Sequence, residues 1–381
     1  MTLNFDLTEE QQMIKKTLKE FADEVVAPGA IERDKTKQFP LDIFRQLADM
    51  GMMGLPFPES YGGAGADSIS FAIVTEELSR VCASTGITYS AHISLGGAPL
   101  NLFGTHEQKE KYLTPICTGE SFGAFGLTEP NAGSDAGGTE TKAHLENGQF
   151  TINGTKIFIT NASYAKHLAI TAITGQKDGQ KEISAIIVPT DVSGFKIYAE
   201  YEKMGLNASN TTELILENVV VAEENLLGVR GEGFKQFLTT LDGGRIGIAA
   251  MAVGIAQGAF NKAVKYAKER KQFGKALAEF QVTQFKLADM AVKIEIARNY
   301  VYKAAWLKDQ GRPFGKEAAI AKYYASEMAM EVCDEAIQIH GGYGYMKEYE
   351  VERYMRDAKL LEIGEGTSEI QKMVIARHIF T

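Results

Sequence analysis

Near the C-terminus, a glutamate stands between two glycines in a stretch that otherwise has helical periodicity. Residues 361–371 read LEIGEGTSEIQ, and Glu365 is at the centre of this segment. The flanking glycines free the backbone, so a flat ligand could approach the carboxylate closely. Apolar surroundings would raise the pKa of this carboxylate toward neutrality, where it could act as a general base. The alternative is a solvated glutamate in a turn between helices, which local sequence alone favours.

Four further segments have compositions that suit ligand binding. Residues 125–135 (FGLTEPNAGSD) could meet a polar ligand with backbone N–H groups and hydroxyls. Residues 241–245 (LDGGR) place two glycines inside a predicted helix at a cost of about 1 kcal/mol each, so a packing or ligand reason is expected. Residues 269–274 (ERKQFG) combine a phosphate-binding arginine with a stacking phenylalanine. Residues 338–344 (QIHGGYG) form the last candidate.

Each of these four segments also has an ordinary structural explanation. Residues 125–135 could be a turn that enters a β domain, and the glycine pair could serve close helix packing. An Arg-Lys pair at a helix end is commonly solvated, and residues 338–344 could be a helix C-cap followed by a turn. No single segment therefore decides the function.

Other catalytic and binding classes lack their motifs. The sequence has no GxxxxGK[ST], no GxGxxG between a strand and a helix, and no GxSxG. Its three cysteines are far apart and its six histidines are scattered, so no metal site is expected. A net charge of −9 gives no support to a nucleic-acid partner. With 45% hydrophobic and 23% charged residues, the chain is expected to be globular.

The N-terminal residues do not resemble a targeting sequence. They lack the basic start and apolar run of a signal peptide and the arginines of a mitochondrial presequence. No stretch of about 18 apolar residues occurs, so we expect no membrane span. We therefore expect the reducing cytoplasm as the location.

The elements that must position these segments change along the chain. At about 150 residues per domain, 381 residues predict two or three domains. In the first hundred residues, Thr8 and Gln11 predict a capping box ahead of a helix with one apolar face: Ile14, Leu18, Phe21 and Val25. Further helices are expected at 43–50 and 69–81, with a Gly- and Pro-rich loop at 56–65.

From about residue 121 the pattern favours strands. Residues 150–159 are a hairpin candidate, because Asn153-Gly154 favours a type I′ turn. Short runs rich in Ile, Val and Thr at 168–174, 182–188 and 212–221 predict more strands. A small antiparallel β domain, either a barrel or a sandwich, is expected here.

From about residue 232 the strand signals stop. Four long segments with helical spacing predict an antiparallel four-helix bundle: 234–270, 280–309, 316–339 and 349–379. The expected fold is therefore an α+β multidomain protein. Its predicted parts are an N-terminal helical domain, a middle β domain and a C-terminal bundle, at residues 1–120, 121–230 and 231–381.

Taken together and in this order, seven short segments resemble the acyl-CoA dehydrogenase family, closest to its short-chain (butyryl-CoA) members. They are LTEPNAGSD, FITNA, DGGRIGIAA, ERKQFG, QIHGGYGY, RDAK and EGTSEIQ, and they span essentially the whole chain. The resemblance implies an FAD enzyme of fatty acid β-oxidation that converts an acyl-CoA to the trans-2-enoyl-CoA. It also implies that electrons pass to electron-transferring flavoprotein and that the chain forms a homotetramer.

The resemblance also implies a role for individual residues. Glu365 would be the base that removes the α proton while the β hydrogen leaves as hydride to flavin N5, and its N–H would bind the thioester carbonyl. Contacts with the flavin ring are implied for Phe125, Leu127, Thr128, Phe158, Ile159 and Thr160. Contacts with the rest of FAD are implied for Gly133, Ser134, Thr367, Ser368 and Glu369. The adenine half of FAD would be held across a subunit boundary by Arg270, Phe273, Gln281, Gln338, Ile339, His340, Gly341 and Gly342. Contacts with the acyl-CoA are implied for Ser134, Asp242, Arg245 and Gly366.

Two positions depart from relatives in the family. Isovaleryl-type members supply the base from the position before the arginine of this helix, which is Gly244 here, so Glu365 keeps the role. Most short- and medium-chain members have tyrosine where this chain has Gly364. We expect the missing ring to widen the acyl pocket toward branched or longer chains. An oxygen-using oxidase and a non-catalytic flavin- or acyl-CoA-binding scaffold remain as alternatives, although a scaffold has no need of the base.

Overall fold

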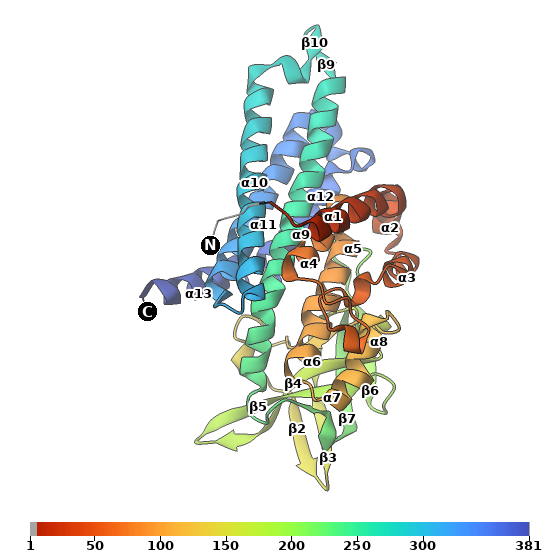
Figure 1. Cartoon of the computed structure of the whole chain (residues 1–381), viewed down its shortest axis with the longest axis vertical. Coiled ribbons are helices and arrows are strands. Elements are labelled where there is room, and N and C mark those ends of the chain that lie inside the picture. The colour runs from red at the N-terminus through yellow and green to blue at the C-terminus, as the bar shows by residue number, and fades with distance from the viewer. Residues whose placement is uncertain (1–5, 381) are drawn as a thin grey trace.

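The computed structural model describes residues 6–380, and its elements follow the expected order of helices, strands and helices (Figure 1). The N-terminal part contains α1 (Glu9–Phe21), α2 (Ala30–Thr36), α3 (Leu41–Asp49), α4 (Ser68–Val81), α5 (Ala83–Ala91), α6 (Ala98–Phe103), α7 (His106–Gln108) and α8 (Thr114–Cys117). The predicted capping box is confirmed, because the Gln11 N–H donates to Thr8 Oγ1 at 3.2 Å and the Thr8 N–H donates to Gln11 Oε1 at 2.9 Å. Leu18 is fully buried on the apolar face of α1.

The middle part is a β-sheet, as predicted. It contains β1 (Phe125–Gly126), β2 (Lys142–Glu146), β3 (Gln149–Thr160), β4 (His167–Lys177), β5 (Gln180–Pro189), β6 (Phe195–Glu200), β7 (Thr211–Ala222) and β8 (Leu226–Leu227). Within residues 6–380 these strands form one sheet in the order β6-β7-β3-β2-β4-β5-β8, with β1 paired to β4. Most pairs are antiparallel, but β4 pairs in parallel with both β1 and β2, which the alternating pattern did not indicate.

The predicted hairpin at Asn153-Gly154 is wrong. Residues 149–160 form the single strand β3, and the turn into it uses Asn147 and Gly148, which both have positive φ. At Gly154 the register with β7 shifts, which marks a β-bulge. A Cβ at Gly154 would lie 2.3 Å from the Thr141 hydroxyl, so the glycine is needed for a close approach rather than for a turn.

Three of the four predicted C-terminal helices are continuous: α9 (Gly233–Glu269), α10 (Gln281–Asp309) and α11 (Gly315–His340). The short hairpin of β9 (Lys271–Gln272) and β10 (Lys275–Ala276) joins the first two. The fourth is interrupted, because α12 (Val351–Lys359) and α13 (Ser368–Phe380) flank a turn that contains Glu365. The expectation of one long helix over 349–379 is therefore wrong, and the two glycines beside Glu365 lie at the break.

Helix α9 runs from the sheet to the β9–β10 hairpin along the long axis of the molecule (Figure 1). Its length and hydropathy would suit a membrane-crossing helix, but 72% of its apolar window is buried inside the protein. Alanines on α9 and α11 are fully buried where these two helices pack together. Small side chains let helix axes approach closely, so α9 is the central core helix of the C-terminal part.

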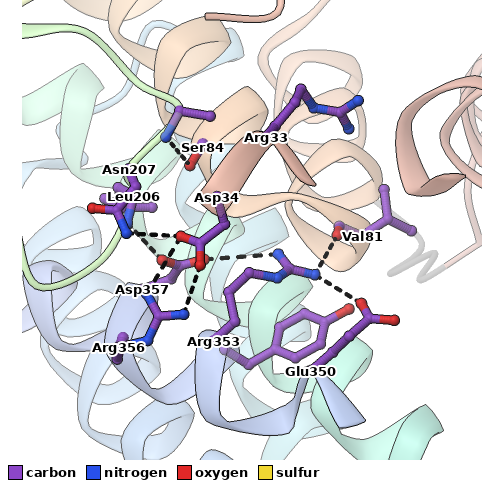
Figure 2. Close-up of polar contacts among 12 residues, drawn as sticks. Arg33, Asp34, Val81, Ser84, Leu206, Asn207, Glu350, Arg353, Arg356 and Asp357 are labelled. Atoms are coloured by element: carbon purple, nitrogen blue, oxygen red, sulfur yellow. Dashed lines mark hydrogen bonds and ion pairs between the residues drawn. The ribbon is translucent and has the colours of Figure 1, made fainter. Parts of the chain in front are cut away.

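Helix α12 is joined to the N-terminal helices by two arginines (Figure 2). Arg356 Nη2 lies 2.7 Å from Asp34 Oδ2 on α2. Arg353 Nη2 donates to the backbone carbonyl of Val81, at the end of α4, at 3.1 Å. Arg353 is only 3% exposed, so its guanidinium group is buried where it donates to the Val81 carbonyl.

The same helix is joined to the middle part through Asp357 (Figure 2). Its buried carboxylate accepts a 2.6 Å hydrogen bond from the N–H of Leu206, in the segment between β6 and β7. Burial raises the pKa of Asp357 to about 6, against the attraction of Arg353. Asn207 Nδ2 completes the network with a 2.9 Å hydrogen bond to Asp34. The α12 junction, defined as Asp34, Arg353, Arg356 and Asp357 with their partners, therefore connects all three parts of the chain.

Breaking this junction should lower the stability of the whole molecule. Replacing Arg356 with Gln leaves the half-buried Asp34 carboxylate without its cation, so we expect the free energy of unfolding to fall by about 2 kcal/mol. Urea unfolding followed by circular dichroism measures this change. Lys196→Gln is the matched control, because its ion pair with Glu217 is well exposed and should contribute less than about 1 kcal/mol. Equal losses in the two variants would contradict the role of the junction.

Candidate active site

Glu365 has an unusual backbone conformation in the turn between α12 and α13. Its φ is 52° and that of Gly366 is 95°, so two successive residues are left-handed. A non-glycine residue in this region is uncommon and persists where its surroundings fix it. The turn is fixed at the carbonyl of Gly366, which accepts hydrogen bonds from Lys322 Nζ at 2.6 Å and from Gln371 Nε2 at 2.9 Å.

The carboxylate of Glu365 is isolated from water and from hydrogen-bond donors. Both of its oxygens are buried, and neither has a hydrogen-bond partner within residues 6–380. Burial raises the pKa of Glu365 to about 7, while attraction by Lys322 and Arg245 opposes this rise. A carboxyl group with such a pKa is partly ionised at neutral pH and can accept a proton there. The alternative of a solvated turn glutamate does not fit this burial.

Of the two glycines in α9, Gly243 and Gly244, the structure explains why the second has no side chain. A Cβ on Gly244 would lie 2.1 Å from Glu365 Oε2, whereas a Cβ on Gly243 would meet only the end of the Lys308 side chain at 3.7 Å. Leu95 provides an apolar neighbour, at 3.4 Å from the same Gly244 position. The carboxylate therefore occupies the space that a side chain at 244 would take.

The predicted substrate residues Asp242 and Arg245 lie on the same turn of α9. Arg245 Nη1 pairs with Asp242 Oδ1, three residues earlier, and the arginine is only 5% exposed. Burial lowers the pKa of Arg245 and raises that of Asp242, against their mutual attraction. The structure thus brings this pair together with Glu365 around Gly244.

The residues after Glu365 begin helix α13. Thr367 Oγ1 accepts a hydrogen bond from the N–H of Ile370 at 3.3 Å, as an N-cap residue does. Ser368 is buried and its hydroxyl donates to Glu327 of α11 at 2.7 Å, while Glu369 is exposed in the first turn. No acceptor within residues 6–380 takes the N–H of Glu365, so this donor is free for a ligand.

A buried ion pair between Lys156 and Glu129 connects the segment 125–129 to strand β3. Lys156 Nζ donates to the Leu127 carbonyl at 3.2 Å and lies 2.6 Å from Glu129 Oε1. Although burial alone would raise it, the pKa of Glu129 is lowered to about 2 by the Lys156 ammonium. The Ile157 N–H donates to the Thr128 carbonyl at 2.9 Å. Residues 125–128 and 158–160, which the sequence predicts to contact the flavin, are therefore brought side by side.

The members of this group differ in exposure. Phe158 has a φ of 59° and is 59% exposed, at a register shift between β3 and β7, which is a strained and solvent-facing position for an aromatic residue. Phe125 and Ile159 are buried, and the Phe125 ring stacks on Phe237 at 4.0 Å. Ser134 is exposed in the loop that follows, as is the neighbouring Gly133.

A cavity of about 530 Å³ lies where α9 ends beside the end of α11. Its lining residues are Tyr266, Arg270, Gln272, Leu277, Ile339, His340, Gly341, Gly342, Tyr343 and Met346. Arg270 lies over the Tyr343 ring at 5.4 Å, and His340 stacks on Tyr266 at 4.3 Å. Planar groups and a guanidinium at one cavity suit a nucleotide.

Three predicted residues lie outside this cavity, on the surface. Phe273 is 93% exposed at the tip of the β9–β10 hairpin, and Gln281 and Gln338 are exposed. The hairpin and the sheet lie at opposite ends of the molecule (Figure 1). Within one chain, the two groups of predicted cofactor residues are therefore far apart.

Sequence reasoning missed two residues that shape the site, Lys322 and Gln371. Both are fully buried and both hold the Gly366 carbonyl. A signal for Lys322 was present, because it lies on a helix face of small residues that includes Ala318, Ala325 and Ala329. A lysine on a buried face is rare unless it has a specific partner.

The chain matches three domains known from other proteins. These are the N-terminal, middle and C-terminal domains of acyl-CoA dehydrogenases, at residues 8–120, 124–219 and 231–380. The chain belongs to the acyl-CoA dehydrogenase family. The predicted family, and with it an oxidoreductase of a flavin-dependent class, is thereby confirmed.

Individual members of this family align with essentially the whole chain. The probable acyl-CoA dehydrogenase YngJ of Bacillus subtilis is 59% identical over 99% of this chain and all of its own length. A short-chain specific acyl-CoA dehydrogenase of Clostridium acetobutylicum is 52% identical over the same shares. The structure of butyryl-CoA dehydrogenase from Megasphaera elsdenii matches with a TM-score of 0.97, 46% identity and full coverage of both chains. These matches confirm the predicted architecture.

The names of three further matches mention FAD or an electron-transferring flavoprotein. An acyl-CoA dehydrogenase from Bacillus anthracis, solved in complex with FAD, has a TM-score of 0.93 and 35% identity, over all of this chain and 68% of that one. A chain from work on the electron transferring flavoprotein of Acidaminococcus fermentans has a TM-score of 0.97 and 49% identity, over 99% of both chains. The caffeyl-CoA reductase-Etf complex subunit CarC of Acetobacterium woodii is 45% identical over 97% of this chain and 98% of its own length.

A methyl group at position 244 should displace the Glu365 carboxylate. In Gly244→Ala the Cβ would overlap Glu365 Oε2, so the carboxylate must move, and we expect turnover of an acyl-CoA to fall by about 10²-fold. Thermal stability should hold, because alanine favours a helix over glycine by about 1 kcal/mol. Steady-state kinetics and a thermal melt check both points. Gly243→Ala is the control and should keep its activity. Similar activities in the two variants would contradict the claim that the space at Gly244 is needed for the Glu365 carboxylate.

Proposed function

We propose that this chain is an FAD-dependent dehydrogenase that oxidises a short-chain or branched acyl-CoA to the trans-2-enoyl-CoA. The observation that carries this proposal is the buried Glu365 carboxylate, which lacks a hydrogen-bond donor within residues 6–380. An α proton of a thioester is a poor acid, and a carboxylate outside water with a pKa of about 7 is a stronger base than a solvated one. FAD, when bound, supplies the acceptor for the hydride from the β carbon.

Glu365 would contribute to the reaction through two groups. Its carboxylate takes the α proton, and its backbone N–H, which has no acceptor within residues 6–380, donates to the thioester carbonyl oxygen where negative charge develops. The fixed left-handed turn keeps this donor in place before the substrate arrives. The surrounding protein excludes water from the carboxylate.

The residues of the chain fit FAD at two places. The exposed Phe158 ring and the pinned segment 125–128 offer a surface for the isoalloxazine ring, together with Thr160. The cavity that contains Arg270 and Ile339 to Gly342 offers a place for the adenine half. The sheet and the β9–β10 hairpin lie at opposite ends of the molecule. We therefore propose that Arg270, Phe273, Gln281 and Gln338 bind the FAD of a neighbouring copy.

The acyl-CoA would lie along the turn of α9 that faces Glu365. We propose that Asp242 and Arg245, paired with each other beside Gly244, contact the CoA moiety, together with Ser134 and Gly366. The absence of a side chain at Gly364 leaves room for the acyl group next to the base. A Cβ at this position would have its nearest neighbour, the Leu360 carbonyl, at 3.5 Å.

We further propose a homotetramer in the cytoplasm that passes electrons to an electron-transferring flavoprotein. Exposed apolar side chains on α10 and α13 support contacts between copies: Val282, Phe285, Val292, Ile296, Met373, Ile379 and Phe380. The names of the Acetobacterium and Acidaminococcus proteins support the partner. The domain limits 1–120, 121–230 and 231–381 are kept as part of this proposal.

Removing the base should abolish the proposed reaction. In Glu365→Gln, anaerobic addition of butyryl-CoA should bleach the flavin absorption at least 10²-fold more slowly than in the parent protein. Stopped-flow absorbance measures this rate. Glu362→Gln, three residues away and paired with Lys359, is the control and should bleach at the parental rate.

Two further measurements distinguish the alternative functions. A protein that stays colourless after addition of FAD would contradict the cofactor and leave a scaffold. Rapid oxygen consumption during aerobic turnover would indicate an oxidase instead of a dehydrogenase that uses a protein acceptor. Retained bleaching in Glu365→Gln would remove this residue as the base.

Filling the space at Gly364 should narrow the range of acyl groups. In Gly364→Tyr we expect the ratio of kcat/KM for isovaleryl-CoA to that for butyryl-CoA to fall by about 10-fold, because the ring would occupy pocket volume. Parallel kinetics with both thioesters measure this ratio. A parent protein that accepts butyryl-CoA alone, or an unchanged ratio in the variant, would contradict the role of Gly364.

A further inference from the structure

Lys322 of α11 is a fully buried lysine beside the proposed base. Its ammonium donates to the carbonyl of Gly366, directly after Glu365, at 2.6 Å. Burying an ammonium is costly unless its charge has a use or a partner. No salt bridge within residues 6–380 involves Lys322, so the carbonyl is its hydrogen-bonded partner and the charge is not neutralised by a contacting carboxylate.

The charged groups around Glu365 come from two helices. From α9, Arg245 attracts the carboxylate, but it is already paired with Asp242. From α11, Lys322 attracts it more strongly than Arg245 does. Glu327 and Glu362 also attract the Lys322 ammonium, although neither forms an ion pair with it in the described chain. Of the two cations that attract Glu365, Arg245 is paired with Asp242, whereas Lys322 forms no ion pair in the described chain.

We infer that Lys322 is a positioning residue for Glu365: its ammonium fixes the turn at the Gly366 carbonyl and its positive charge favours the ionised carboxylate. This inference rests on the proposed function, in which Glu365 must be ionised to accept the α proton. Without the charge of Lys322, only Arg245 would oppose the effect of burial, so the carboxyl group would stay protonated to a higher pH and fewer molecules would be ready to react at neutrality.

Gln371 separates the two parts of this role. Its Nε2 donates to the same Gly366 carbonyl at 2.9 Å and to the Glu365 carbonyl at 3.3 Å, and its side chain is also fully buried. It carries no charge. Loss of Gln371 should loosen the turn without changing the electrostatic field at the carboxylate, whereas loss of Lys322 should change both.

The test compares Lys322→Met and Gln371→Met with the parent protein in the pH dependence of flavin reduction by saturating butyryl-CoA. Activity requires ionised Glu365, so the rate rises with pH through its pKa. For Lys322→Met we expect the midpoint of this rise to move up by about one pH unit or more, so that much of the rate lost at pH 7 returns at high pH. For Gln371→Met we expect a slower rate with the midpoint unchanged.

A second readout and a second variant keep the test decisive. Infrared difference spectra follow protonation of Glu365 without turnover, through the carboxylic acid band that is missing in Glu365→Gln, and should show the same shift. Lys322→Arg keeps the charge, so its midpoint should stay within about 0.3 unit of the parent. Lys322→Gln, which is also neutral, replaces Lys322→Met if methionine prevents folding.

The outcomes distinguish this inference from the proposed function. An unchanged midpoint in Lys322→Met, an equal shift in Gln371→Met, or a Lys322→Arg midpoint displaced by a unit would overturn the positioning role while leaving Glu365 as the base. Failure of both butyryl-CoA and isovaleryl-CoA to bleach the parent protein, with Glu365→Gln indistinguishable from it, would instead overturn the proposed function.

Discussion

The carboxylate of Glu365 is out of water and has no hydrogen-bond donor within residues 6–380, and both conditions cost free energy. The surrounding structure offsets this cost only in part. Lys322 and Arg245 attract the carboxylate without contacting it through a hydrogen bond, so it stays available. A direct salt bridge would have stabilised the anion further and made it a weaker base. The site therefore requires cations that attract the carboxylate without bonding to it. Gly244, which has no side chain, leaves the space that the carboxylate occupies.

Such a balance requires the turn of Glu365 to stay fixed relative to α9 and α11. A short 3-10 helix, Leu360–Glu362, joins the turn to α12, and α12 is the helix that carries the junction with the other two parts of the chain. Arg356 and Asp357 precede the base by fewer than ten residues. The RDAK motif, at residues 356–359, thus anchors the helix that precedes Glu365.

The sequence predicted much of this architecture because its signals are local. The capping box at Thr8 and the periodicity of α9 act within a few residues of themselves, and both elements formed where expected. The importance of Glu365 could also be anticipated, from the glycines beside it and from the resemblance of its motif. Its burial could not, because the carboxylate lies against Gly244 and is attracted by Lys322, and both residues are distant from it in sequence.

The errors of prediction have the same origin. Asn153-Gly154 has the composition of a hairpin turn, but β7 pairs with β3 along both sides of it, and the close approach of Thr141 requires the glycine. The fourth long helix was expected because its apolar spacing continues past Gly364, yet the carbonyl of Gly366 bonds to side chains of α11 and α13 rather than continuing a helix. At both places a contact between distant segments outweighs the local preference. At the second, that contact also creates the left-handed turn on which the proposed chemistry depends, so the departure from local rules and the functional site coincide.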